Sequence, residues 1–345
     1  MTNLEKVRIG IAGLTHGHVG WILSRPFHAT YEVVGIAEED TAVYGRYAQR
    51  FDLSKIPIYT TLEEMLDTAQ PEAVVAFGSI YDHLAVVQTC APRGVHVMVE
   101  KPLAVNMSHA QAMADLARQH HIHLLTNYET TWYASNHAAY QLVHGERLIG
   151  EVWKVVIYDG HKGPQEIGVQ PEFLAWLTDP VLNGGGAVID FGCYGANLMT
   201  WLMRGEKPVA VTAVTQQIKP HLYPHVDDEA TIVVTYPKAQ AIIQGSWNWP
   251  IARKDMEVYG QTGQLHALNA LDLRIQTQAD KEARLEKLEP LAEPVNDPFV
   301  YFSAVIRHQT PLHDNDLSAL SNNLTVVQIL DAARESARSG QVVYL

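Results

Sequence analysis

The first 125 residues alternate short apolar runs with amphipathic stretches, and this alternation constrains the fold more than any other feature. We expect strands at 7–12, 31–37, 73–77, 95–99 and 122–125, with helices at 19–23, 41–50, 62–66, 79–90 and 107–119. Continuous apolar runs are typical of parallel strands that are buried on both faces. The pattern therefore predicts an α/β chain that begins with a doubly wound parallel sheet.

The composition excludes several classes of protein. A length of 345 residues favours two domains, and 47% hydrophobic content supplies large cores. The net charge of −13 argues against nucleic acid and anionic membrane surfaces as partners. Two cysteines suit a reducing compartment, no apolar run reaches the ~20 residues of a membrane span, and no signal-peptide core is recognisable. We expect a cytoplasmic protein.

A glycine-rich turn follows the first strand. The segment 13–20 reads Gly-Leu-Thr-His-Gly-His-Val-Gly and leads into a short helix. Strand, turn and helix are the parts of a dinucleotide pyrophosphate site, where slim glycines let backbone N–H groups approach the phosphates. A strict G-x-G-x-x-G fingerprint would place glycines where Thr15 and His18 stand, so the motif alone is weak. The cofactor-binding candidates in this turn are Gly13, Thr15, His16, Gly17 and His18.

Glu38 ends the second strand, 25 residues after Gly13, near the position of a ribose-binding acid. Its carboxylate would accept hydrogen bonds from ribose hydroxyls and repel a 2′-phosphate. We therefore expect NAD as the cofactor, and NADP is disfavoured. The alternative is that the acids at 38–40 merely begin the helix at 41–50, where the helix dipole favours negative charge.

The central strand ends abruptly at Glu100-Lys101-Pro102. Pro102 cannot donate a ladder hydrogen bond and holds the preceding residue extended, so the strand stops there. In open α/β sheets, ligands bind beyond the carboxyl ends of the strands. Lys101 is thus placed for chemistry, unless it is only a solvated lysine at a strand tip.

The second half carries a polar stripe on an apolar helix. Asp190 and Tyr194 are four residues apart and Asn197 follows three later, so a continuous helix would align them on one face. Such a stripe costs desolvation free energy unless it faces a ligand cleft or a satisfied buried network. His161 and Lys162 lie in a polar loop, where they would contact substrate or be merely solvated.

These segments together resemble the glucose–fructose oxidoreductase/inositol dehydrogenase/MocA family over nearly the whole chain. The resemblance is carried by the glycine turn, Ser79 to His83, Glu100-Lys101-Pro102, and Gly184-Gly185-Gly186 with Asp190-Phe191-Gly192-Cys193-Tyr194. It implies an N-terminal Rossmann domain and a C-terminal α/β domain with a large open, mostly antiparallel sheet. It also adds Ser79, His83, Glu100 and Lys101 to the expected cofactor contacts. Tyr194 stands where most members have histidine, which resembles the branch with a catalytic tyrosine.

The expected domains are 1–125, for the dinucleotide, and 126–345, for substrate and oligomer contacts, with a closing helix at 317–338 that packs back on the first domain. We expect a homo-oligomer, dimer or tetramer, formed through the C-terminal sheet, with Trp247 and Trp249 at that contact or against a sugar. No metal is expected. His221 and His225 invite a metal site, but nearby prolines disfavour a regular helical pair.

The leading hypothesis is an NAD-dependent oxidoreductase acting on a hydroxyl of a sugar, polyol or related small molecule. Tyr194 would take the hydroxyl proton, Lys101 would stabilise the alkoxide and lower the phenol pKa towards neutrality, and Asp190 would orient Lys101. His161, Lys162 and Asn197 would add substrate contacts. One alternative is an elimination or glycosidase-type enzyme that retains its NAD, and another is a non-catalytic dinucleotide and sugar sensor.

Overall fold

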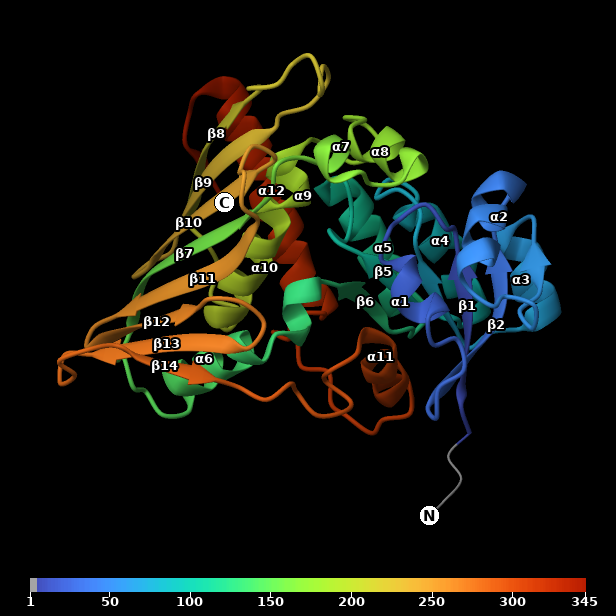
Figure 1. Cartoon of the computed structure of the whole chain (residues 1–345), viewed down its shortest axis with the longest axis horizontal. Coiled ribbons are helices and arrows are strands. Elements are labelled where there is room, and N and C mark those ends of the chain that lie inside the picture. The colour runs from blue at the N-terminus through green and yellow to red at the C-terminus, as the bar shows by residue number, and fades with distance from the viewer. Residues whose placement is uncertain (1–4) are drawn as a thin grey trace.

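The computed structural model describes residues 5–345 and contains two sheets of different topology (Figure 1). The first sheet has six strands in the order β3-β2-β1-β4-β5-β6, and every neighbouring pair is parallel. This is the strand order of a doubly wound dinucleotide-binding fold, which confirms the expected architecture. Its strands are β1 (Val7–Ala12), β2 (Tyr31–Ala37), β3 (Ile58–Tyr59), β4 (Ala73–Ala76), β5 (His96–Glu100) and β6 (Leu124–Asn127).

Five α-helices connect these strands and cover the two faces of the sheet (Figure 1). They are α1 (Val19–Leu23), α2 (Thr41–Arg50), α3 (Leu62–Ala69), α4 (His83–Cys90) and α5 (Met107–Gln119). Short 3-10 turns lie at Ala91–Arg93 and Glu129–Trp132. Asp40 caps α2 by accepting hydrogen bonds from the backbone N–H groups of Ala42 and Val43. The cap therefore belongs to Asp40 and leaves Glu38 for another role.

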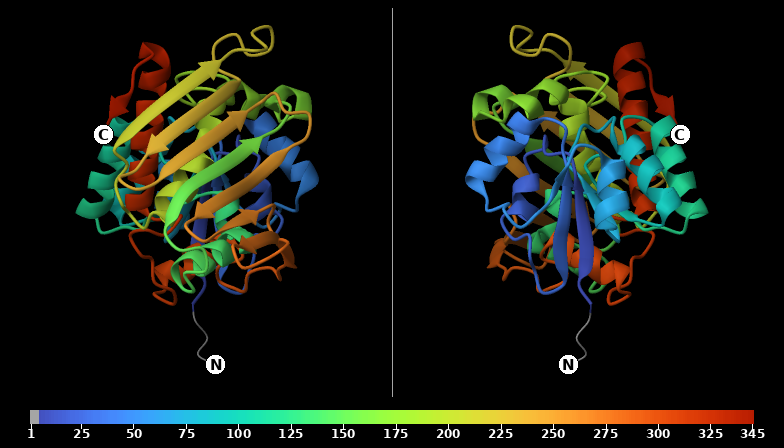
Figure 2. Two further views of the ribbon diagram at one scale, coloured as in Figure 1. Left: turned by 90° about the vertical axis from the view of Figure 1, so that its left-hand side faces the viewer. Right: turned by 90° about the vertical axis from the view of Figure 1, so that its right-hand side faces the viewer.

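The second sheet has nine strands in the order β14-β13-β12-β11-β7-β10-β9-β8-β15. Only the β10–β7 pair is parallel, so the expected mostly antiparallel sheet is confirmed. Its strands are β7 (Val152–Gly160), β8 (Ala210–Gln216), β9 (Glu229–Thr235), β10 (Gln240–Ser246), β11 (Arg253–Gly260), β12 (Gly263–Ala267), β13 (Asp272–Thr277), β14 (Arg284–Lys287) and β15 (Val343–Tyr344). Its outer face lies open in the left view of Figure 2.

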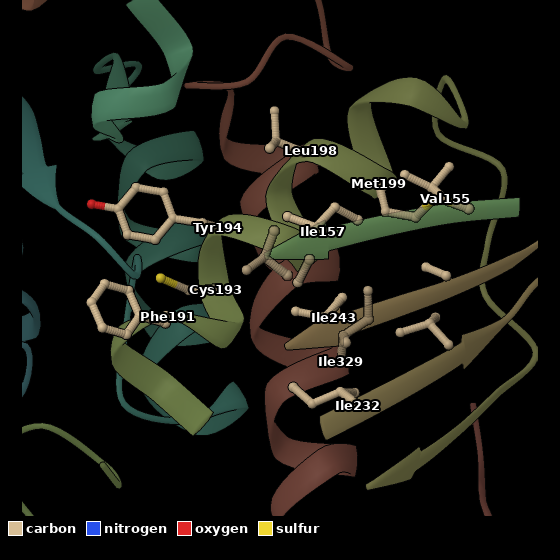
Figure 3. Close-up of a cluster of buried hydrophobic side chains, with 14 of the residues drawn as sticks. Val155, Ile157, Phe191, Cys193, Tyr194, Leu198, Met199, Ile232, Ile243 and Ile329 are labelled. Carbon is tan, nitrogen blue, oxygen red and sulfur yellow. The ribbon is translucent and has the colours of Figure 1, made fainter. Parts of the chain in front are cut away.

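Helices pack on the inner face of this sheet, between the two sheets (Figure 1). The helices of this half are α6 (Ala134–His144), α7 (Pro164–Ile167), α8 (Pro171–Leu177), α9 (Ala187–Asp190), α10 (Gly192–Leu202), α11 (Pro298–Ile306) and α12 (Leu320–Ser339). In Figure 3, Met199 of α10 lies beside Val155 of β7, and Leu198 and Ile157 belong to the same buried cluster. Burial of these side chains fixes α10 against the sheet and leaves its first turn directed at the other half.

A glycine allows the close approach of this helix to the sheet. A Cβ on Gly245 of β10 would lie 2.8 Å from the carbonyl oxygen of Ala187 and 3.1 Å from the Cβ of Phe191. The first distance is shorter than real Cβ contacts and the second is tighter than most of them, so glycine lets the α9–α10 segment rest directly on β10. None of the helices in the described residues is long and apolar enough to cross a bilayer.

The end of the chain returns to the first sheet. Phe299 and Phe302 of α11 are fully buried in a core shared with Ile9 and Tyr31 of the first sheet. Helix α12 contacts α5 and β6 as well as α10 and β8. Our domain boundary at residue 125 remains a prediction, and α11 falls outside any simple division at that point.

Candidate active site

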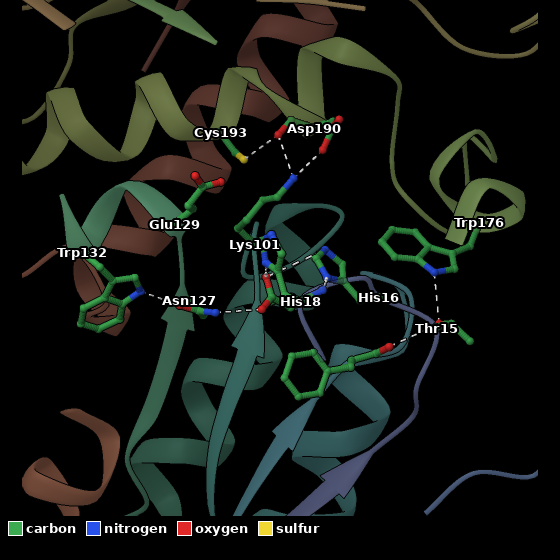
Figure 4. A network of polar contacts seen from close by, with 12 residues as sticks. Thr15, His16, His18, Lys101, Asn127, Glu129, Trp132, Trp176, Asp190 and Cys193 are labelled. Carbon is green, nitrogen blue, oxygen red and sulfur yellow. Dashed lines mark hydrogen bonds and ion pairs between the residues drawn. The ribbon is translucent and has the colours of Figure 1, made fainter. Parts of the chain in front are cut away.

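A buried ion pair joins the two halves of the molecule. Lys101 follows β5, and its Nζ donates to the main-chain oxygen of Asp190 at 3.0 Å and to the Oδ1 of the same residue (Figure 4). Burial alone would lower the pKa of Lys101 and raise that of Asp190, but their mutual attraction outweighs burial and shifts both pKa values in the opposite directions. Both groups are therefore charged near neutral pH.

The second carboxylate oxygen of Asp190 is held by Trp247. The indole Nε1 donates to Oδ2 at 2.9 Å, and the Trp247 side chain is fully buried. Our expectation that Trp247 lies at a subunit contact or against a sugar is therefore wrong. Asp227 adds support from the same region, because its carboxylate accepts hydrogen bonds from the N–H groups of Gly186 and Val188 at the start of α9. Asp190 is thus fixed from both sides.

Tyr194 lies beside this pair, on α10. The expected single helix through Asp190 and Tyr194 is broken, since α9 ends at Asp190 and α10 begins at Gly192. The phenol oxygen points away from the apolar cluster of the second half (Figure 3). The Nζ of Lys101 lies 5.1 Å from the centre of the Tyr194 ring, so the structure brings the three expected catalytic side chains together.

A second lysine approaches the same ring. The Nζ of Lys254 lies 4.3 Å from the ring centre of Tyr194 and donates to the Oε2 of Glu129 at 2.7 Å. It is also 3.9 Å from the Oδ1 of Asp159. Sequence reasoning missed these three residues. Lys254 and Asp159 face each other across β11 and β7, and that register could not be read from separate segments.

The environment of Tyr194 holds the proton on the phenol. Burial raises the pKa of Tyr194 well above its ordinary value, and the negative charge of Glu129 raises it further. The expected lowering of this pKa by Lys101 is therefore wrong for the protein on its own. The phenol is set up as a proton donor.

Two histidines of the glycine turn meet Glu100. The Nδ1 of His18 lies 3.0 Å from Glu100 Oε2, the Nε2 of His16 lies 3.9 Å from the same oxygen, and Asn127 donates to Oε1 at 2.8 Å (Figure 4). Burial would raise the pKa of Glu100, but these histidines and Asn127 bring it down to about 2. Burial lowers the pKa of His16 to about 3, so its ring is neutral. Glu100 is therefore an anion held among hydrogen-bond donors.

This trio is also the group within the described residues with the geometry for a metal ion, because its ligand atoms lie within 4.8 Å of one another. However, the Nδ1 of His16 accepts a hydrogen bond from the N–H of His18 at 3.1 Å. That bond places the ring proton of neutral His16 on Nε2, which then points a donor, and no lone pair, towards Glu100. The arrangement fits a hydrogen-bonded cluster better than a metal centre.

A cavity of about 370 Å³ lies along the carboxyl ends of β1, β2 and β4. Its lining includes four of the expected cofactor contacts: Gly13, Thr15, Glu38 and His83. The Oε2 of Glu38 accepts from the N–H of Leu14 at 2.9 Å and its Oε1 from that of Asp40 at 3.0 Å. Burial raises the pKa of Glu38, which these two bonds oppose. Among described residues, the lining holds no lysine or arginine.

The other expected cofactor contacts lie outside this lining. His16, His18 and Glu100 form the cluster described above, and Gly17 lies in the same turn. Ser79 is buried and donates to the Oδ2 of Asp82 at 2.6 Å.

The second half covers the glycine turn. The indole Nε1 of Trp176, on α8, donates to the Oγ1 of Thr15 at 3.1 Å (Figure 4). The rings of Phe173 and Trp176 lie 4.7 Å and 5.8 Å from that of His16. Thr15, which we expected to bind phosphate, therefore already has a partner from α8.

The three remaining substrate candidates differ in position. The ring of His161 packs edge-on against Phe191 at 4.9 Å, next to Asp190. Lys162 is exposed. Asn197 needs a correction, because it is fully buried and its Nδ2 donates to the main-chain oxygen of Leu317 at 2.8 Å. Because α10 packs against the segment before α12, Asn197 joins a buried polar network and does not face the group around Tyr194.

Comparisons with known proteins agree with this architecture. The trans-1,2-dihydrobenzene-1,2-diol dehydrogenase of Xenopus tropicalis is 27% identical over 219 residues, which are 63% of this chain and 61% of that protein. The Sus scrofa enzyme is 25% identical over 240 residues, 70% of this chain and 66% of its own. The matched region thus spans less than two thirds of either relative.

Solved structures share the fold over the whole chain. Aldose-aldose oxidoreductase from Caulobacter crescentus, complexed with glycerol, matches with a TM-score of 0.82 and 21% identity, covering 99% of this chain and 100% of that one. GenD2 from gentamicin A biosynthesis, in complex with NAD, matches with a TM-score of 0.80 and 22% identity, covering 100% and 98%.

Two family models account for most of the sequence. Residues 7–128 match the oxidoreductase family with an NAD-binding Rossmann fold, and residues 137–266 match the GFO/IDH/MocA C-terminal domain. The chain belongs to the Gfo/Idh/MocA oxidoreductase family.

Proposed function

We propose that this protein is an NAD-dependent oxidoreductase that moves a hydride between the nicotinamide and a hydroxyl-bearing carbon of a sugar, polyol or related compound. The observation that carries the proposal is the meeting of Lys101, Asp190 and Tyr194 from two halves of the chain. The ammonium of Lys101 lies 5.1 Å from the centre of the buried Tyr194 ring and is paired with the fixed carboxylate of Asp190. Groups in this arrangement can exchange protons with an alcohol or a carbonyl.

The cavity at the first sheet fits the dinucleotide. Gly13 has φ +77°, and a Cβ there would lie 3.1 Å from the N–H nitrogen of Gly78. Only glycine keeps this turn low enough for phosphates to approach the backbone. The cofactor would be held by Gly13, Thr15 and the turn, with Glu38 and His83 along the cavity wall, and the bound nicotinamide would supply the hydride chemistry.

The lining of this cavity favours NAD over NADP. Glu38, Glu39 and Asp82 lie along it. A 2′-phosphate would meet like charge there without a basic partner. The carboxylate of Glu38 is also fixed by two backbone N–H groups, so it cannot turn away from the cavity at low cost.

The side chains of the protein have separate roles in proton transfer. Tyr194 donates its proton to a carbonyl oxygen during reduction, or receives one from a hydroxyl during oxidation. Lys101 places its ammonium near the oxygen on which negative charge develops. Asp190 keeps Lys101 charged and directed, while Trp247 prevents Asp190 from rotating.

The proposal is tested with a panel of sugars and polyols, followed by absorbance of the reduced nicotinamide. We expect a wild-type substrate whose turnover falls about 10²–10⁴-fold in Tyr194→Phe, with cofactor binding retained. Tyr128→Phe is the matched control, because Tyr128 is equally buried and its ring packs against Tyr194 at 5.5 Å. An unchanged rate in Tyr194→Phe would remove the tyrosine from the mechanism. Product without accumulating NADH would favour the NAD-retaining elimination.

We also propose that copies of the chain associate through the open outer face of the nine-stranded sheet (Figure 2). A large sheet with one uncovered face is commonly closed by a partner. Light scattering at several concentrations tests this, and a monomer throughout would contradict it.

A further inference from the structure

A second enclosed site lies next to Tyr194, around Asp159 at the end of β7. A cavity of about 10 Å³ is lined by Asp159, Tyr194, Lys254, Thr130 and Asn136, among others. That volume is about the room that a single water molecule needs. Asp159 is only 2% exposed, so it belongs to the interior of the protein.

Three buried polar atoms of the residues around this cavity have no hydrogen-bond partner within the described part of the chain. They are both carboxylate oxygens of Asp159 and the Oγ1 of Thr130. Buried polar groups are nearly always hydrogen-bonded. We therefore expect a small group between these atoms that can both donate and accept hydrogen bonds. A water molecule with two to four polar contacts meets that need.

The two lysines nearest to Asp159 are each already paired with another carboxylate. The charged groups that face it are Lys254, Lys101, Glu129 and Asp190, with Tyr133, Tyr194 and Cys193 as nearby titratable groups. Lys254 is bonded to Glu129 at 2.7 Å and Lys101 to Asp190, so both ammonium groups already have a carboxylate partner. Burial then raises the pKa of Asp159 well above its ordinary value, which favours the protonated form of its carboxyl group.

We propose that Asp159 is a buried proton reservoir that recharges Tyr194 through one water held in this cavity. The inference rests on the proposed function in its reductive direction. A bound reduced nicotinamide would supply the hydride to the carbonyl carbon. The phenol O–H bond of Tyr194 breaks as its proton goes to the carbonyl oxygen. The phenolate then takes a proton from the water, and the water takes one from the carboxyl group of Asp159.

The remaining negative charge moves to a place that can hold it. After the transfer, the Asp159 carboxylate lies 3.9 Å from the ammonium of Lys254, while the phenol is neutral again. Solvent returns a proton to Asp159 and completes the cycle. Asp159 is thus a positioning residue: it acts through Tyr194, to which it returns a proton, and it does not contact the substrate.

The first test does not depend on activity. At neutral pH, the infrared spectrum of the wild-type protein should contain the carbonyl stretch of a protonated buried carboxyl group, and Asp159→Asn should lack that band. Thr130→Val should shift the band because it removes a partner of the water. Thr131→Val should leave it unchanged, since Thr131 is also buried but lines a different cavity. A wild-type spectrum without the band would overturn the proposal, even if no substrate is found.

The second test separates the first turnover from the later ones. With NADH and a carbonyl substrate, Asp159→Asn should complete one rapid turnover with the proton already on Tyr194. It should then slow by about 10–100-fold, an effect in the range of proton-transfer catalysis. Thr130→Val should show the same burst more weakly, and Thr131→Val should behave as wild type. An equal loss in the first and later turnovers, or no loss in either, would refute the reservoir.

Discussion

The buried Lys101–Asp190 pair should show strong energetic coupling. Lys101→Met leaves the Asp190 carboxylate without its cation, and Asp190→Asn leaves a buried ammonium beside a neutral amide that still bonds Trp247. Both residues are only 6% exposed, so each single change should cost about 3–5 kcal/mol of unfolding free energy. The double variant contains no unpaired charge. Its cost should be smaller than the sum of the two single costs by about 2–3 kcal/mol.

Thermal unfolding of the four proteins measures this coupling. An unfolding entropy of about 2.1 cal/mol/K per residue, taken over 345 residues, makes each kcal/mol equal to about 1.4 °C of melting temperature. Each single variant should therefore melt about 4–7 °C lower than wild type. The control is the exposed Arg338–Glu335 pair of α12, where the same cycle should give a several-fold smaller coupling. Additive losses for the buried pair would refute the reasoning.

Three further predictions follow from the first sheet. Burial lowers the pKa of His83 to about 4. Below about pH 6.5, His83 is therefore protonated in the unfolded chain but stays neutral in the folded protein. Through this group, the free energy of unfolding should fall by about 2 kcal/mol between pH 7 and 5. His83→Asn should weaken this pH dependence in denaturation experiments, whereas a change at the exposed His221 should not. Gly13→Ala and Gly94→Ala both place alanine at positive φ and should each cost about 1–2 kcal/mol. Only the first should weaken NAD binding by calorimetry, because a Cβ at Gly94 meets no atom within 4 Å. Glu38→Gln should raise the NADP-to-NAD ratio of kcat/KM by about tenfold, a change of ~1.4 kcal/mol; an unchanged ratio would contradict the role of Glu38.

The sequence predicted the first sheet well because its local signals agree. The expected strands at 7–12 and 31–37 and helices at 41–50 and 107–119 match β1, β2, α2 and α5 at both ends. Apolar runs, caps and turn glycines all favour the same boundaries there. Helix α11 was not predicted, since its nine residues are wholly buried and show no amphipathic period. Asp297 followed by Pro298 was the available signal, because Asp is a preferred N-cap and Pro a preferred first residue.

The candidate site was predictable in part for a related reason. Lys101, Asp190 and Tyr194 stand in short recognisable segments, so their meeting could be expected without knowing how the second sheet pairs. Lys254 and Asp159 become neighbours only through the register of β11 on β7, which depends on long-range packing. The break at Phe191 also escaped prediction, because Asp227, far along the chain, holds the backbone at the start of α9.

The late position of α11 has a consequence for synthesis of the protein. At about 5–20 residues per second, the ribosome adds Pro298 roughly 9–34 s after Asn127, the last residue of β6. During that interval the nascent first sheet lacks Phe299 and Phe302, and the apolar surface around Ile9 and Tyr31 is exposed to water and to chaperones. The core of the first sheet is therefore completed only after α11 has been synthesised.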